Sequence, residues 1–362
     1  MEDSAAEQSG AVTSDAQGFE RNIGPAEIAY QTAKEFLSAG KYTEAIDNYQ
    51  KAVSIKPGYL AAWSDLGKAY SDHKEYEKGI AAYQQALELE PGNEGLIAAI
   101  GYNYLNLEQW DEAAGYYEML VAQDSLSFTG NVNLAFIAQR RGDDREAIQY
   151  YEKVLEVRPD DATTMGTLAT LYGNMGNDEK KYEYLQMAID ADPDNHQFKR
   201  QLAKAYFTER EYAKAAPIYE QLVEIYPDNA DLHKRYGFAL SQTDRAPEAP
   251  VVLEKAIELG GDDDPFTWAL LSKIYNENGM YTKAAEAARS GLALGSGEEA
   301  FLNYQWGEAL SKLGRYEEAM ARFQKVASMG DPTWSSSAVK QVDRQQKLIQ
   351  RREAEKEQQM YE

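Results

Sequence analysis

The sequence predicts an all-α fold in which pairs of helices stack one on another, and three observations predict it. The same residue classes recur with a period of 34 residues over most of the 362-residue chain. Within each period, apolar residues are spaced as on the faces of two helices. Prolines or other turn-forming residues close the periods. A period of this length is the signature of a repeat protein.

A small residue marks the second half of each period. Stepping by 34, with one extra residue before each of the last two steps, gives Ala45, Gly79, Ala113, Ala147, Lys181, Ala215, Ala249, Ala284 and Ala319. Only Lys181 is large in this column. We therefore expect nine repeats, between an acidic segment 1–25 and a final segment 334–362. The repeats are 26–59, 60–93, 94–127, 128–161, 162–195, 196–229, 230–263, 265–298 and 300–333.

Two further columns contain residues of contrasting size. Counting from the first residue of each repeat, position 8 is always small, as in Gly67 and Gly101, and position 24 is mostly aromatic, as in Tyr83 and Tyr117. Small residues at positions 8 and 20 allow two helices to approach closely, and the large ones fill the space beside them. The tyrosines of position 24 keep a strict 34-residue phase, so we expect core packing there and not an aromatic cage.

Helix ends are also predicted. Proline at position 32, as in Pro91 and Pro193, ends the second helix of a repeat, because it lacks an N–H and clashes with the preceding turn. The asparagines that follow, Asn93 and Asn195 among them, are good N-caps for the next helix. Pro247 and Pro250 predict an irregular start for one second helix.

The two ends differ from the repeats. Residues 1–25 contain few apolar side chains, and we expect this acidic tail to be disordered. Residues 334–362 read as one more helix, a capping helix that extends beyond the last repeat. Its apolar face would seal that repeat, and it consists of Trp334, Ala338, Val342 and Ile349.

This pattern resembles the tetratricopeptide (TPR) repeat family. The second repeat resembles the family signature most closely, with Trp63, Leu66, Gly67, Tyr70, Gly79, Tyr83, Ala86 and Pro91 at the expected positions. The resemblance covers residues 26–333. It implies a right-handed α-solenoid, a superhelix of helix-turn-helix repeats whose first helices line a concave groove. It also implies binding of a protein or peptide partner in that groove.

The resemblance places positions 2, 5, 9, 12 and 13 of each repeat in the groove. The cations there are Lys34, Lys68, Arg140, Arg200, Lys204, Lys234, Lys273 and Lys312. The acidic residues are Glu27, Asp72, Asp231, Glu277 and Glu308, and aromatic residues are interleaved. The groove thus leans basic within an acidic protein. We predict an acidic, extended peptide there, contacting Phe136, Arg140, Arg200, Lys204, Phe207, Lys234 and Phe238. Solvation of the inner surface is the alternative account of these charges.

Site chemistry of other kinds is not indicated. The chain has no cysteine, and its three histidines (His73, His196 and His233) lack the spacing of a metal site, so we expect them at the surface. The acidic turn 260–264 lacks the spaced ligands of a calcium loop. No phosphate-binding loop or nucleophile motif occurs. We therefore expect no cofactor, no metal and no enzymatic activity.

Three functions remain open: an interaction scaffold or adaptor, a self-assembling structural module joined through terminal repeats or the C-terminal helix, and a non-catalytic regulatory subunit of a separate enzyme. A net charge of −23 disfavours nucleic acid as a partner, and no apolar run approaches the ~18 residues of a membrane span. Because no signal segment follows Met1, we expect a cytoplasmic location; a periplasmic one is the alternative if a signal was removed before this numbering.

Overall fold

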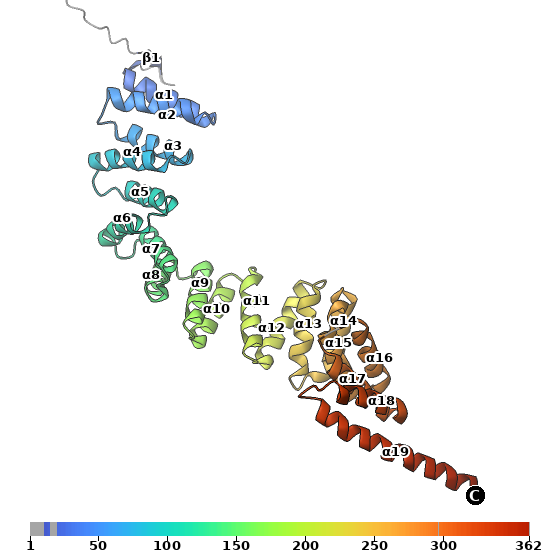
Figure 1. Ribbon diagram of the computed structural model, residues 1–362. Helices are drawn as coiled ribbons and strands as arrows, with labels where there is room; N and C mark the ends of the chain where they lie inside the picture. Colours follow the sequence, from blue (N-terminus) through green and yellow to red (C-terminus); the bar gives the residue numbers. More distant parts are fainter. Residues whose placement is uncertain (1–10, 15–19, 296, 362) are drawn as a thin grey trace, which may run out of the picture. The chain divides into compact units, whose positions relative to one another are not determined.

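The computed structural model describes residues 11–14, 20–295 and 297–361, and these are almost entirely helical (Figure 1). The chain divides into two compact units, Met1–Tyr184 and Leu185–Glu362. In each unit the helices form consecutive pairs, and the predicted all-α fold of stacked helix pairs is confirmed. We call the first helix of a pair the A helix and the second the B helix.

Two short strands precede the helices. β1 (Ala11–Ser14) pairs antiparallel with β2 (Glu20–Ile23), so that Ala11 lies opposite Ile23. A two-stranded hairpin is at best marginally stable by itself, so the expected disorder of the acidic tail stays a prediction. The rest of that expectation, for residues 1–10 and 15–19, lies outside the described residues.

The helices of the first unit each pack mainly on their neighbours in the chain. They are α1 (Pro25–Ser38), α2 (Tyr42–Ile55), α3 (Leu60–Asp72), α4 (Tyr76–Leu89), α5 (Glu94–Asn106), α6 (Trp110–Gln123), α7 (Phe128–Arg141), α8 (Asp144–Val157) and α9 (Ala162–Asn174). Helix α10 (Asp178–Ala191) crosses the boundary between the two units. Odd-numbered helices up to α9 are A helices, and even-numbered ones are B helices.

The second unit continues in the same alternation, and its helices also pack on their sequence neighbours. They are α11 (His196–Thr208), α12 (Tyr212–Ile225), α13 (Ala230–Ser241), α14 (Ala249–Glu258), α15 (Pro265–Glu277), α16 (Tyr281–Ala293), α17 (Glu299–Lys312), α18 (Tyr316–Ser328) and α19 (Ser335–Tyr361). Short 3₁₀ turns, η1 (Ala246–Glu248) and η2 (Gly261–Asp263), flank α14. The irregular start predicted from Pro247 and Pro250 is thus confirmed.

The periodic columns are buried. Every alanine of the position-20 column is fully buried, from Ala45 to Ala319. The position-24 side chains are buried too, and they cover the small residue at position 8. A Cβ added to Gly101 would lie 2.8 Å from the Tyr117 ring, and one added to Gly67 would lie 2.8 Å from the Tyr83 ring. The 34-residue phase therefore records one repeated helix contact.

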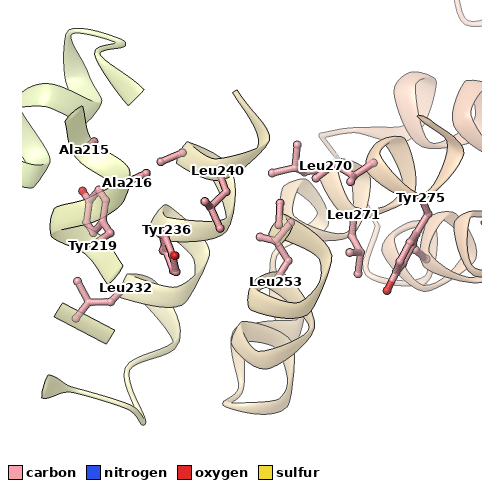
Figure 2. Packing of buried hydrophobic residues seen from close by; sticks show 14 of the residues in the cluster. Ala215, Ala216, Tyr219, Leu232, Tyr236, Leu240, Leu253, Leu270, Leu271 and Tyr275 are labelled. Atoms are coloured by element: carbon pink, nitrogen blue, oxygen red, sulfur yellow. The ribbon is translucent and has the colours of Figure 1, made fainter. Parts of the chain in front are cut away.

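The core of the second unit continues across several helix pairs. In Figure 2, Tyr219 of α12, Tyr236 and Leu240 of α13, Leu253 of α14 and Tyr275 of α15 belong to one apolar cluster. A single pair would leave one of its faces in water, so each pair is stabilised by the next.

The predicted helix ends are confirmed by side-chain caps and by the place of the prolines. The Asn93 side chain accepts a bond from the Leu96 N–H at 3.0 Å, and Asn229 accepts one from the Leu232 N–H at 3.0 Å. Each asparagine satisfies one of the free N–H groups at a helix start. Proline follows the end of the preceding helix, as Pro91 follows α4.

Helix α19 packs on the last pair and covers it. Trp334 lies 5.0 Å from the rings of both Phe301 and Tyr304, and Ala338 is fully buried. Further along, Arg352 bonds to the carboxylate of Glu317 on α18. The predicted C-terminal capping helix is confirmed. No helix in the described part of the chain has the length and apolarity that a bilayer crossing requires.

Candidate functional site

The groove positions predicted from the sequence lie on the A helices, and cavities open between neighbouring A helices in each unit. In the first unit, a cavity of about 430 Å³ lies between α3 and α5 and includes Ser64 and Lys68. In the second unit, a cavity of about 200 Å³ lies between α15 and α17. We call the surface formed by the A helices the A-helix face.

The cavity between α15 and α17 is lined by charged side chains, namely Lys273, Glu277, Glu308 and Lys312. Burial raises the pKa of Glu308, and the nearby cations Lys312 and Arg344 oppose that rise. Lys273 pairs with Glu277 at 3.7 Å. With both signs of charge inside a small volume, this cavity favours no single class of charged ligand.

A small cluster on the first unit contains two of the predicted site residues. The Phe136 ring is 41% exposed and lies 6.1 Å from the Trp110 ring. The Arg140 guanidinium lies 5.3 Å from the same indole, a cation–π contact. Among the described residues no carboxylate lies within ion-pair distance of Arg140. The next residue, Arg141, is paired with Asp111.

A longer row of aromatic rings crosses the A-helix face of the second unit. Phe207 of α11 lies 5.3 Å from Phe238 of α13, which lies 5.8 Å from Phe266 of α15. Tyr212, the first residue of α12, contacts both Phe207 and Phe238, at 5.5 and 5.4 Å. Phe266 is 43% exposed. We call these four side chains the aromatic row.

Two further predicted site residues are cations on α11, the helix that carries Phe207. Arg200 is stacked on the Tyr226 ring at 4.3 Å, and its Nε has no hydrogen-bond partner among the described residues. Lys204 is exposed. In the described part of the chain neither has a carboxylate within ion-pair distance, so both charges are uncompensated.

Lys234, on α13, differs from these two. Its Nζ pairs with Asp264 at 3.2 Å. Burial of Asp264 opposes its ionisation, but hydrogen bonds from Lys234, Thr267 and the Phe266 N–H outweigh that effect and hold the pKa of Asp264 below its usual value. The Lys234 charge is therefore largely satisfied within the protein.

The seven predicted site residues thus fall into two groups. Phe136 and Arg140 belong to the first unit, and the other five belong to the second. Sequence reasoning missed Trp110, Tyr212 and Phe266. The first two occupy position 17 of their repeats, a column that also contains Tyr42, Tyr76, Tyr281 and Tyr316. That recurrence was the signal that could have found them.

Larger cavities lie between neighbouring B helices, and the sequence did not indicate them. One of about 580 Å³ between α2 and α4 has an apolar floor of Trp63, Leu66 and Tyr70. The other, of about 620 Å³ between α14 and α16, has Trp268 in the same repeat position and a charged rim. That rim consists of Glu254, Glu258, Lys283, Glu286 and Arg289.

The histidines form no site. His73 bonds to Glu75 and stacks on Tyr42. The expectation that all three lie at the surface is wrong for His233, which is buried and has its Nδ1 3.0 Å from the Asn229 carbonyl oxygen. The reason is its place at position 4 of a repeat, on the core-facing side of α13. Within the described ranges no three His, Asp or Glu side chains are grouped as metal ligands.

The helix pairs and their repeated contact define a helical-repeat protein, and family comparisons give its family. Models described as "TPR repeat" or "Tetratricopeptide repeat" match residues 33–74, 61–93, 132–163, 206–274 and 302–328. The chain is a tetratricopeptide repeat protein, and the resemblance seen in the sequence is confirmed. No curated protein matches it significantly.

Solved structures with similar folds include MamA from Desulfovibrio magneticus RS-1, which is 14% identical. The match covers 47% of this chain and 97% of the MamA chain, with a TM-score of 0.43. YrrB, described as a TPR protein with an unusual peptide-binding site, is 23% identical and covers 49% of this chain and 91% of its own, with a TM-score of 0.42. A tetratricopeptide repeat protein from Parabacteroides merdae is 14% identical. The match covers 89% of this chain and 99% of that protein's chain, with a TM-score of 0.36.

Proposed function

We propose that the chain is a protein-interaction scaffold that binds an extended, acidic peptide segment on the A-helix face of the second unit. The observation that supports this most is the aromatic row together with the uncompensated cations Arg200 and Lys204 on α11, the helix that carries Phe207. Partly exposed rings can anchor apolar side chains of a peptide, and the cations can bind its carboxylates.

Charge explains why a basic surface would matter in this protein. The chain carries a net charge of −23, so an acidic partner is repelled by most of its surface. A local basic site with apolar rings then provides both attraction and a reason for specificity. Tetratricopeptide repeats are typical of non-catalytic interaction modules, and we propose that this chain acts by binding alone.

Self-assembly through the chain's end is less favoured. The apolar face of α19, with Trp334, Ala338 and Val342, is already packed on the last helix pair. The large apolar side chains of that helix that remain exposed, Val339 and Met360, are far apart along it. Light scattering over a range of concentrations tests this, and a mass that rises with concentration would support self-assembly.

Charge reversal tests the proposed binding site. In the double variant Arg200→Glu/Lys204→Glu, we expect binding of an acidic peptide, measured by fluorescence polarisation, to fall at least tenfold. Helicity measured by circular dichroism should be unchanged, since both side chains lie outside the apolar core. Unchanged peptide binding in a folded double variant would refute the proposed site.

A further inference from the structure

Helix α11 differs in charge from every other helix of its unit. It carries Lys199, Arg200 and Lys204 and no Asp or Glu, whereas each of α12 to α19 contains at least one acidic residue. In a chain with 60 acidic residues and 37 basic ones, such a helix is unusual. Arg200 and Lys204 have no carboxylate partner among the described residues, whereas Lys234 is paired with Asp264.

Arg200 and Lys204 are not equivalent as anion receptors. The Arg200 guanidinium is held against the face of Tyr226, at 4.3 Å. A planar guanidinium that is already positioned can grip a carboxylate through two parallel hydrogen bonds. The exposed Lys204 side chain is not held by any ring or carboxylate in the described ranges, and it would lose more side-chain freedom on binding. Arg200 is therefore the better candidate for a fixed carboxylate contact.

The distance between Arg200 and the aromatic row is set by the helix. Arg200 and Phe207 are seven residues apart on α11, which is nearly two turns, so they lie on the same face. At a rise of 1.5 Å per residue they are separated by about 10.5 Å along the axis. An extended peptide that lies parallel to α11 advances roughly 3.3–3.6 Å per residue, so about three of its residues span that distance.

Building on the peptide binding proposed above, we propose that this surface selects peptides by the spacing between an acidic and a large apolar residue. The peptide places a carboxylate side chain on Arg200 and, three residues away, an aromatic or large aliphatic side chain on Phe207, where the aromatic row begins. A different spacing would select Lys204, which is three residues from Phe207 and only about 4.5 Å away along the axis. A peptide that used Lys204 would need its acid and its apolar residue to be adjacent.

Three labelled peptides of equal composition separate these cases. Each carries one Glu and one Phe in an Ala/Ser background, placed one, three or five positions apart, and binding to the full chain is followed by fluorescence polarisation. We expect the three-residue spacing to bind at least fivefold more tightly than the other two. Arg200→Lys keeps the charge but removes the planar fork, so it should abolish that preference. Arg289→Lys makes the same exchange on the B helix α16, outside the proposed site, and as the matched control it should leave the preference in place.

The possible results distinguish the spacing from the site itself. Equal affinities for all three peptides, together with loss of binding in the Arg200→Glu/Lys204→Glu variant, would overturn the spacing and leave the proposed function standing. Tightest binding of the adjacent pair, lost in Lys204→Gln, would also overturn it. No binding of any peptide would overturn both. Circular dichroism of each variant checks that it is folded.

Discussion

The same repeat positions produce a small cluster on the first unit and a long aromatic row on the second. Phe136 and Phe238 both occupy position 9 of a repeat, and each contacts the aromatic residue at position 17 of the repeat before it, Trp110 or Tyr212. Phe136 contacts no second ring within the described ranges, whereas Phe238 also contacts Phe207 and Phe266.

The difference comes from the neighbouring repeats. The positions that supply Phe207 and Phe266 to the second unit hold Leu105 and Thr163 in the first. The aromatic row is therefore a property of three consecutive repeats and not of one position. Substitutions in and around the two surfaces test this contrast, beginning with the largest expected effect.

Removing the Phe238 ring should give the largest difference in peptide affinity between the aromatic row and the Phe136 cluster. Phe238→Ala eliminates contacts to three other rings, and we expect it to weaken binding of an acidic peptide by about ten- to a hundredfold, the range of an interface hot spot. Phe136→Ala is the matched control at the same repeat position and should cost less than about threefold. Titrations by fluorescence polarisation decide this, and equal losses for the two variants would break the contrast.

The second prediction concerns stability, and it tests the helix contact that recurs in the core, outside the proposed binding surface. Gly101→Ala places a Cβ 2.8 Å from the Tyr117 ring, so we expect a loss of about 1–3 kcal/mol in the free energy of unfolding. Gly115→Ala, one helix later, meets nothing within 4 Å and should stabilise the protein by about 0.5–1 kcal/mol. Urea denaturation measures both. If Gly101→Ala were neutral, a clash with the facing ring would not be what keeps position 8 small.

The smallest expected effect concerns the paired cation. Asp264→Asn retains a side chain able to cap α15 but frees Lys234, and we expect it to strengthen acidic-peptide binding about twofold. The pKa of Asp264 is lowered in the folded protein, so its charge adds stability above its ordinary pKa of 3.8, and that stability is lost as the pH falls through the folded value. Thermal unfolding should show the variant less stable at pH 7, and the difference should shrink as the pH is lowered below 3.8. A difference that did not shrink on acidification would mean that the Asp264 charge is not its source.

The sequence by itself determined the helix pairs, their caps and the core columns. These features repeat every 34 residues because one contact, such as the Tyr117 ring over Gly101, is made again in each repeat. A residue pattern that recurs in each repeat can be recognised from the sequence alone. The resemblance to tetratricopeptide repeats, and not the periodicity alone, assigned Arg200 and Phe207 to the A-helix face.

Only the tertiary structure decided which of those surface residues are in contact. Lys234 is held by Asp264, 30 residues away, and Phe266 completes the aromatic row from the next repeat. Burial of His233 was likewise missed. Such contacts join side chains on different helices, and surface residues need not recur with the period, because solvent does not impose on them the shape that the core imposes on alanines and tyrosines.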